Sequence, residues 1–188
     1  MPDIDKFIPD PEQAALVVVD IQEKLAQVMD QEVMNKVVQN TIVLIEAART
    51  FEYPILMTEQ YTKGLGKTVS GLQDALQSVD PLEKLAFSCC GDRHFKAALK
   101  ASGAKDILLC GIETHVCVLQ TALDLLKEGY RVFLPADAVC SRKKLNWKLA
   151  CNLMHDAGVV VGSTEIFIFQ MLRESGTERF KKLSKLIR

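Results

Sequence analysis

The sequence of 188 residues predicts an α/β fold in which helices cover both faces of a parallel sheet. Short apolar runs alternate with longer segments of helical periodicity along the whole chain. Several runs, such as 107–109, are continuously apolar, which is typical of strands buried on both faces of a sheet. No repeat, linker or low-complexity segment divides the chain, so we expect a single domain over residues 1–188.

In the first half, an apolar run rich in valine ends at Asp20, where open α/β sheets place ligand-binding groups. A stretch without Pro or Gly then predicts one long amphipathic helix over 21–51. The polar, glycine-bearing segment 58–66 is expected to be a loop. Lys84 interrupts the third apolar run, where a lysine is costly unless its ammonium is paired or reaches solvent. The strands expected here are 14–19, 54–57 and 81–88.

In the second half, the central strand is expected to end at Gly111, and Thr114 is the expected N-cap of a helix closed by Gly129. Ser163 or Thr164 can cap the last helix, with Glu165 favourable in its first turn. The strands expected here are 107–109, 130–134 and 158–162, and the other helices are 93–102 and 143–157.

Cys117 falls in the first turn of the helix that follows the central strand. Backbone N–H groups there have no intrahelical partner and carry the positive end of the helix dipole. This position favours the nucleophilic thiolate and could hold the oxyanion of an acyl-transfer intermediate. The alternative is a buried free cysteine that packs as a small apolar side chain.

Asp20, Lys84 and Cys117 are expected at the same edge of the sheet, because each lies in or just after one of its strands. Together they form a coherent set for hydrolysis. Cys117 would attack a carbonyl, Asp20 would take its proton and later activate water, and Lys84 would hold the carboxylate. Taken singly, Asp20 could be a helix cap, Lys84 could reach solvent from an edge strand, and Cys117 could be a packing residue.

The composition excludes several other classes of function. With a formal net charge of −1, the chain has no overall basic field, so we expect no nucleic-acid partner. No apolar segment is long enough to span a membrane, and the acidic start is unlike a secretory or transit signal, so we expect no membrane partner and a cytoplasmic location. The six cysteines include no C-x-x-C pair, which indicates reduced thiols.

No cofactor or metal is expected from the motifs. Neither GxGxxG nor GxxxxGK[ST] is present. The three histidines, His94, His115 and His155, are far apart and form no i, i+4 pair, so we expect no metal site.

Four segments carry a resemblance to a known family: LVVVDIQEKL, LMTEQYTKGLG, EKLAFSCC and LCGIETHVCVLQTALDLLKEGYRVFLPADAVCSR. In this order they resemble the isochorismatase-like cysteine hydrolases, in the isochorismatase domain-containing branch, over residues 16–172. The resemblance implies a three-layer α/β/α, Rossmann-like fold with a six-stranded parallel sheet. It also implies a catalytic triad of Asp20, Lys84 and Cys117, a cis peptide bond between Ile112 and Glu113, and an oxyanion hole of the Glu113 and Cys117 amides.

Two departures narrow the expected reaction. Nicotinamidases of this superfamily carry an Asp-x-His metal motif where this chain has Glu59, Gln60 and Tyr61, which argues against a zinc-dependent nicotinamidase. Isochorismatases that cleave a vinyl ether lack the cysteine that this chain keeps at Cys117.

The sequence thus predicts a metal-independent cysteine hydrolase that acts on a small amide-like or related carbonyl substrate through a covalent thioester. Gln22, Glu59, Tyr61 and His115 are the expected substrate-binding residues. The resemblance further implies a homo-oligomer, at least a dimer. The alternatives are a non-catalytic binding or interaction protein of the same fold and, less favoured, a nuclease.

Overall fold

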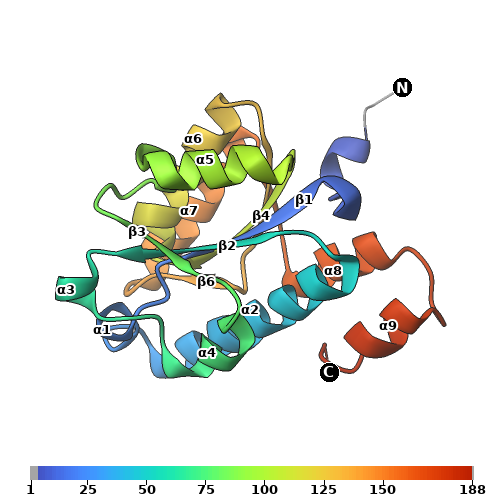
Figure 1. Cartoon of the computed structure of the whole chain (residues 1–188), viewed down its shortest axis with the longest axis horizontal. Helices are drawn as coiled ribbons and strands as arrows, with labels where there is room; N and C mark the ends of the chain where they lie inside the picture. Colours follow the sequence, from blue (N-terminus) through green and yellow to red (C-terminus); the bar gives the residue numbers. More distant parts are fainter. Residues whose placement is uncertain (1–3, 188) are drawn as a thin grey trace.

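The computed structural model describes residues 4–187, which form a parallel sheet between two layers of helices (Figure 1). In the described part of the chain the sheet has seven strands, in the order β3-β2-β1-β4-β5-β7, and β6 pairs with β4. The expected three-layer α/β/α fold is therefore confirmed. The strands are β1 (Ala14–Val19), β2 (Ile55–Gln60), β3 (Pro81–Lys84), β4 (Asp106–Ile112), β5 (Arg131–Pro135), β6 (Val139–Cys140) and β7 (Val160–Gly162).

Each face of the sheet has its own apolar core, because the strand side chains alternate between the two faces. One face is covered by α2 (Gln31–Phe51), α4 (Ser70–Leu76), α8 (Thr164–Leu172) and α9 (Glu178–Leu183). The other is covered by α5 (Arg93–Ser102), α6 (Leu119–Lys127) and α7 (Lys144–Ala157). Two short helices, α1 (Glu23–Ala26) and α3 (Thr62–Leu65), follow the carboxyl ends of β1 and β2.

Four details differ from the sequence-based expectation. The strand expected over 81–88 ends at Lys84. The helix expected over 21–51 is broken at a turn, and α2 begins only after Asp30, whose carboxylate accepts a hydrogen bond from Val33 N. The strand expected to end at Met57 continues to Gln60, so the first three residues of the expected loop, 58–60, are strand. The two-residue strand β6 was missed because so short a run carries no periodicity.

The register of the sheet brings the ends of β1 and β4 together. Val19 lies opposite Gly111, so that Asp20 follows beside the end of β4. A side chain at Gly111 would place its Cβ 2.1 Å from the Val19 carbonyl oxygen, and Gly111 has a φ of 127°. Only glycine permits this close approach at that backbone conformation.

Within residues 4–187, no helix combines the length and the apolar character needed to cross a bilayer. All six cysteines are buried and none is in a disulfide.

Candidate active site

Asp20 lies directly after β1 and is fully buried. Its φ of 49° lies in the left-handed region, which aspartate tolerates better than most residues. Its amide donates to the Thr58 carbonyl at 3.2 Å, and Thr58 Oγ1 donates to Asp20 Oδ1 at 2.7 Å. The end of β2 therefore fixes both the backbone and the carboxylate of Asp20.

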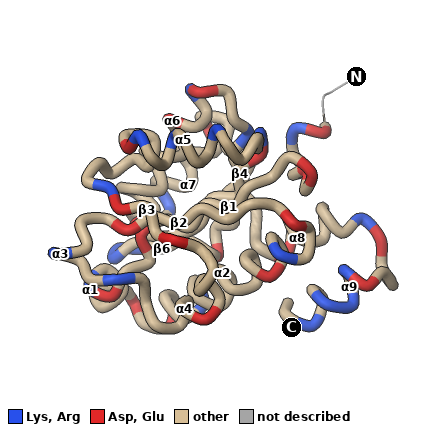
Figure 2. The backbone as a smooth tube through the Cα atoms, viewed as in Figure 1, with Lys and Arg blue, Asp and Glu red and all other residues tan. Residues whose placement is uncertain are grey.

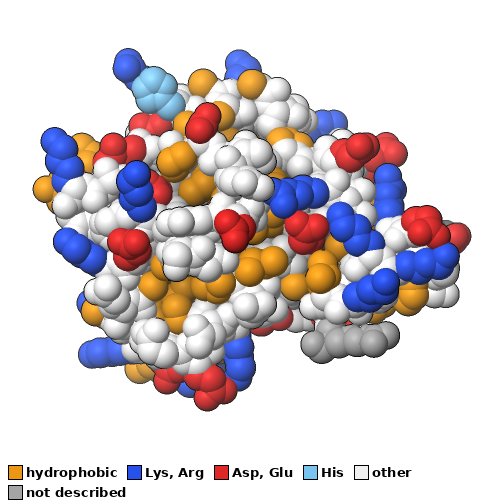
Figure 3. All heavy atoms as spheres, turned by 60° about the horizontal axis from the view of Figure 1, so that its bottom comes forward, with side chains coloured by type: hydrophobic (Ala, Val, Ile, Leu, Met, Phe, Trp, Pro, Cys, Tyr) orange, Lys and Arg blue, Asp and Glu red, His pale blue; other side chains and the backbone are white. Residues whose placement is uncertain are grey.

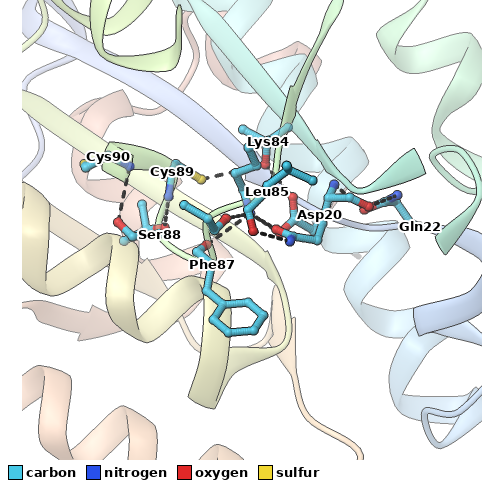
Figure 4. Close-up of polar contacts among 12 residues, drawn as sticks. Asp20, Gln22, Lys84, Leu85, Phe87, Ser88, Cys89 and Cys90 are labelled. Atoms are coloured by element: carbon cyan, nitrogen blue, oxygen red, sulfur yellow. Dashed lines mark hydrogen bonds and ion pairs between the residues drawn. The ribbon is translucent and has the colours of Figure 1, made fainter. Parts of the chain in front are cut away.

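Lys84 is the last residue of β3, and its side chain is only 1% exposed. Its ammonium donates to Asp20 Oδ2 at 2.6 Å and to Gln60 Oε1 at 2.8 Å. The carbonyls of Ala86 and Phe87 accept from it at 3.1 and 3.0 Å (Figure 4). The ammonium thus has as many acceptors as it can use, which compensates for its loss of water. It neutralises and orients the Asp20 carboxylate.

Cys117 lies in a π-helical turn, Thr114–Val118, that separates β4 from α6. The expected cap is absent: Glu113 is the N-cap, and Thr114 Oγ1 has no hydrogen-bond partner among the described residues. The Cys117 thiol is buried, and it lies near enough to the Asp20 carboxylate for that negative charge to raise the pKa of the thiol. Asp20 therefore stands between the ammonium of Lys84 and the thiol of Cys117. π-Helical turns of this kind are frequent at functional sites.

The ionisation of Cys117 differs from the sequence-based expectation. Burial is the largest cause that raises the pKa of the thiol above its ordinary value, followed by the negative charge of Asp20. The charge of Lys84 opposes this increase. The expectation of a ready thiolate was wrong because the dipole argument did not include burial and the adjacent carboxylate. The structure therefore favours the protonated thiol of Cys117, beside the Asp20 carboxylate.

Glu113 follows β4 across a cis peptide bond with Ile112. Its buried carboxylate accepts from Arg142 N at 3.0 Å and from Arg142 Nε at 3.1 and 3.0 Å. The Glu113 carbonyl accepts from the amides of Val116 and Val118, which starts the nucleophile turn. Arg142 thus holds the residue whose backbone begins this turn.

Two of the expected substrate-binding residues are used by the protein itself. Gln22 is fully buried; its amide nitrogen donates to the carbonyls of Gln60 and Gly66, and its oxygen accepts from Gln60 N. Glu59 accepts from Thr68 N and Thr68 Oγ1 at 2.7 and 2.8 Å. Through these hydrogen bonds, both residues hold the segment that follows β2 against the carboxyl ends of the strands. Their contact with a substrate stays a prediction.

The other two are more open. Tyr61 follows β2 with a φ of 38° and is 50% exposed. His115 lies two residues before Cys117 in the same turn, half-buried, with Nδ1 3.0 Å from Ser141 Oγ. These side chains can still change partners when a substrate enters, and their role in binding also stays a prediction.

Sequence reasoning missed three groups that complete the site, namely Thr58, Gln60 and Cys89. The first two lie in the part of β2 that was expected to be loop. Cys89 Sγ lies 3.7 Å from Thr58 Oγ1, and burial raises its pKa to about 11 (Figure 4). A signal was available for Gln60, because a lysine buried in a strand needs acceptors from the neighbouring strand.

A cavity of about 890 Å³ lies beside this site, between α2 and residues 136–147. We call it the α2 groove. None of the expected substrate-binding residues lines it. Its wall includes Ser141 and Arg142, which contact His115 and Glu113, so it adjoins the nucleophile turn from the side of β6.

Within residues 4–187, no group of three or more His, Cys, Asp or Glu side chains is arranged to hold a metal ion. The chemistry that these side chains themselves can carry out is nucleophilic attack by a thiol beside a carboxylate base.

Comparison with known proteins gives a consistent result. The isochorismatase domain model matches residues 14–166. The chain is 37% identical over 184 residues to the secreted isochorismatase effector Isc1 of Phytophthora sojae, covering 95% of this chain and 86% of that protein. It is 35% identical to isochorismatase domain-containing protein 2A of Mus musculus, covering 95% and 84%. The structure of the MAR1 ribonuclease from Caenorhabditis elegans superposes with a TM-score of 0.88 at 36% identity, covering 96% and 92%.

Proposed function

We propose that this chain, which belongs to the isochorismatase family, is a cysteine hydrolase. Its proposed substrates are small amides or related carbonyl compounds. The observation that carries the proposal is the position of Asp20. Its carboxylate binds the Lys84 ammonium at 2.6 Å, its charge acts on the Cys117 thiol, and all three side chains are buried. A buried thiol beside a carboxylate is an arrangement that supports general-base activation of the nucleophile.

Acylation begins when the Cys117 sulfur attacks the substrate carbonyl carbon while its proton moves to Asp20. Because burial and Asp20 raise the pKa of the thiol, the proton is transferred as the C–S bond forms and not beforehand. The amides of Glu113 and Cys117 are the proposed donors to the oxyanion. The C–N bond then breaks, and protonated Asp20 gives its proton to the leaving amine. The product of this step is a thioester on Cys117.

Deacylation reuses the same groups. Asp20, again a carboxylate, takes a proton from a water molecule, and the resulting hydroxide attacks the thioester carbonyl. The C–S bond breaks, the carboxylic acid leaves, and the sulfur recovers its proton from Asp20. Lys84 stays charged throughout and keeps the carboxylate aimed at the thiol, since four acceptors fix its ammonium.

The test is a screen of small primary amides, with ammonia release and the intact mass of the protein as readouts. We expect turnover by the wild type, and a covalent acyl adduct on Cys117 when the reaction is stopped by acid. Cys117→Ala should lose both. Cys110→Ala is the matched control, because it also removes a buried thiol, located in the apolar core on the other face of the sheet from Cys117. Equal behaviour of the two variants, with no adduct on Cys117, would leave a non-catalytic binding protein as the better account.

A second candidate function is RNA cleavage, which is favoured by the similarity to the structure named as MAR1 ribonuclease. The charge distribution weighs against it. Lys and Arg alternate with Asp and Glu along the chain (Figure 2), and on the face shown in Figure 3 both signs are interspersed with apolar side chains. Proteins that bind nucleic acid usually present a continuous basic surface to the phosphates.

The two candidates separate in one assay. Labelled single-stranded RNA is incubated with the wild type, Cys117→Ala and Asp20→Ala. If cleavage is specific to this site, both variants lose it and salt suppresses it steeply. Cleavage of equal rate in all three proteins identifies a contaminating nuclease and rejects the second candidate.

A further inference from the structure

The α2 groove, the cavity of about 890 Å³ between α2 and residues 136–147, has no part in the proposed reaction. None of Asp20, Lys84 and Cys117 lines it. Its volume lies in the range of about 300–1,000 Å³ that is typical of small-molecule sites. The α2 groove is therefore large enough to hold a small organic molecule at a place separate from the nucleophile.

Apolar side chains contribute to the wall of the groove from both sides. Met29 and Val33 come from the start of α2 and the turn before it, and Val139 and Trp147 come from the opposite side. The Trp147 indole is held in place, because its Nε1 donates to the Ala136 carbonyl at 3.1 Å. A fixed indole with aliphatic neighbours favours a ligand that has an apolar, planar body.

The acidic side chains of the groove are already bound within the protein. Asp30 caps α2 by accepting from a backbone amide of its first turn, at 3.1 Å. Asp137 accepts from Thr164 N and Oγ1 at 2.8 and 2.9 Å, at the start of α8. Glu32 pairs with Lys36 at 2.7 Å. The positive ends of two helix dipoles and one ammonium thus offset these negative charges.

Two cations of the groove, by contrast, keep free donors. Arg142 binds the Glu113 carboxylate through its side-chain Nε, and its terminal Nη1 and Nη2 groups make no hydrogen bond to the described residues. The Lys144 ammonium has no acidic partner within residues 4–187. No acidic residue lies in the first turn of α7, which Lys144 begins. The groove therefore combines an apolar wall with uncompensated positive charge.

We propose that the α2 groove is a binding site for a small organic carboxylate with an aromatic body. The two terminal N–H groups of a guanidinium match the two oxygens of a carboxylate. The ligand carboxylate binds this end of Arg142 and the Lys144 ammonium, and the aromatic body lies against Trp147. Because the Nε side of Arg142 stays on Glu113, the guanidinium bridges two carboxylates. The ligand thus contacts the residue that holds the beginning of the nucleophile turn.

The first test uses the fluorescence of Trp147, which is the only tryptophan of the chain and so reports directly on the groove. Phenylacetate, phenethyl alcohol, phenethylamine and inorganic phosphate are titrated into Cys117→Ala. This background excludes covalent reaction at the nucleophile, so the result does not depend on the proposed hydrolysis. The three organic probes share one aromatic body and differ in charge, whereas phosphate has the charge without the body.

We expect phenylacetate to change the emission of Trp147 saturably, with a Kd in about the millimolar range. It should bind about tenfold or more tightly than the alcohol, the amine or phosphate. The absence of a saturable change overturns the proposal. Equal binding of the alcohol would overturn recognition of the carboxylate, and equal binding of phosphate would overturn recognition of the aromatic body.

A charge reversal locates the carboxylate. Lys144→Glu should weaken phenylacetate binding about fivefold or more, because an attractive charge becomes repulsive. Lys100→Glu is the matched control, since Lys100 is also an exposed helical lysine but does not line the groove. It should change the Kd by less than about twofold, because solvent and salt screen distant surface charges. Circular dichroism verifies that both variants are folded. An equal effect of the two substitutions overturns the assignment.

The last test does not rely on tryptophan emission. In the Cys117→Ala background, a cysteine is placed at Val33, which lines the groove, or at Val28, which is also exposed but lies outside it. The native cysteines are buried, so a maleimide labels the new thiol first. Phenylacetate at about twice its Kd should slow the labelling of Val33→Cys about threefold and leave Val28→Cys unchanged. No protection of Val33→Cys, or equal protection of both, overturns the proposal.

Discussion

Two buried carboxylates lie at opposite ends of the strands of the sheet, one at the carboxyl ends and one at the amino ends. Each carboxylate binds a cationic side chain from another strand. Asp20 follows the carboxyl end of β1 and binds Lys84 at 2.6 Å. Asp106 begins β4 and accepts from Arg131 Nε at 2.6 Å and from Arg131 Nη2 at 2.5 Å. Asp10 N also donates to Asp106, at 2.8 Å. Both carboxylates are fully buried, so burial and pairing alone do not distinguish a reactive group from a structural one.

The two carboxylates differ in their third binding partner and in the end of the strands at which they lie. Asp106 is held by a bidentate guanidinium and a backbone amide, which use its oxygens for fixed contacts. Asp20 is held by an ammonium and a hydroxyl, and it also faces the Cys117 thiol, which can give it a proton. Asp20 lies at the carboxyl edge of a parallel sheet, where α/β proteins bind ligands, and Asp106 lies at the opposite edge. A buried ion pair beside a thiol at that edge is therefore the better candidate for chemistry.

The largest expected difference between the two pairs is in turnover. Asp20→Asn removes the proposed base with little change in shape, and we expect kcat on an amide identified in the screen to fall about 10³- to 10⁴-fold. Asp106→Asn should stay within about twofold of the wild type per folded molecule, because it lies at the far edge of the sheet. Steady-state ammonia release measures both. If the two variants lose activity equally, the distinction between the edges is wrong.

The next difference is in stability when the cation is removed. Lys84→Met leaves the Asp20 charge buried without its partner, and we expect a loss of about 3–5 kcal/mol in the free energy of unfolding. Arg131→Met should cost less, about 2 kcal/mol, because the Arg131 side chain is 37% exposed and water can replace it. Urea denaturation of both variants measures the difference. A larger loss for Arg131→Met would show that the pair at the amino edge is the more important for folding.

The pairs also differ in their effect on the Cys117 thiol. Asp20 raises the pKa of Cys117 through its negative charge, and the positive charge of Lys84 lowers it. A nearby negative charge disfavours the thiolate, so Asp20→Asn, with Lys84 retained, must lower this pKa. We expect the pH profile of Cys117 alkylation by iodoacetamide to move to lower pH by about one unit or more. Asp106→Asn should leave the profile unchanged. Mass spectrometry across pH 6–11 measures it.

In Asp20→Asn, the rate of alkylation at neutral pH and the rate of turnover are expected to change in opposite directions. Asp20→Asn should make the thiol easier to alkylate at neutral pH and yet stop hydrolysis, because alkylation needs a thiolate while hydrolysis needs a base. An unchanged alkylation profile in Asp20→Asn would mean that the carboxylate does not act on the thiol, and the proposed mechanism would fail.

The strands and their common edge could be predicted from sequence, because buried parallel strands are continuously apolar and their carboxyl ends meet at one edge. That is why Asp20 and Lys84 were expected together and lie together. The break near Asp30 was missed because no Gly or Pro marks it. The two glutamines at this site, Gln22 and Gln60, follow no periodicity, so the backbone contacts of Gln22 were also not predicted.

The ionisation of Cys117 illustrates a different limit. Its place near a helix start was visible in the sequence, but its burial and its distance from Asp20 depend on how four strands pack. The Asp106–Arg131 ion pair was not predicted either, although the sequence contained a signal for it. Each residue is a charge at the first position of a strand, and the parallel register places them opposite each other.

The smallest expected effect comes from changing the shape of a cation while keeping its charge. Arg131→Lys preserves the positive charge beside Asp106 but loses the bidentate geometry, since an ammonium is a point donor and a guanidinium a planar fork. Because Arg131 is partly exposed, solvent screens the pair, and we expect a loss of only about 0.5–1 kcal/mol in the free energy of unfolding.

Lys84→Arg is the contrasting change at the carboxyl ends of the strands. The Lys84 ammonium is enclosed by four acceptors spaced for a compact donor, so the larger guanidinium should displace Asp20 and reduce turnover. Urea denaturation and ammonia release on the two exchanges compare them directly. If Lys84→Arg keeps full activity, the position of Asp20 does not depend on the compact ammonium, and the two ion pairs differ only in the edge of the sheet that they occupy.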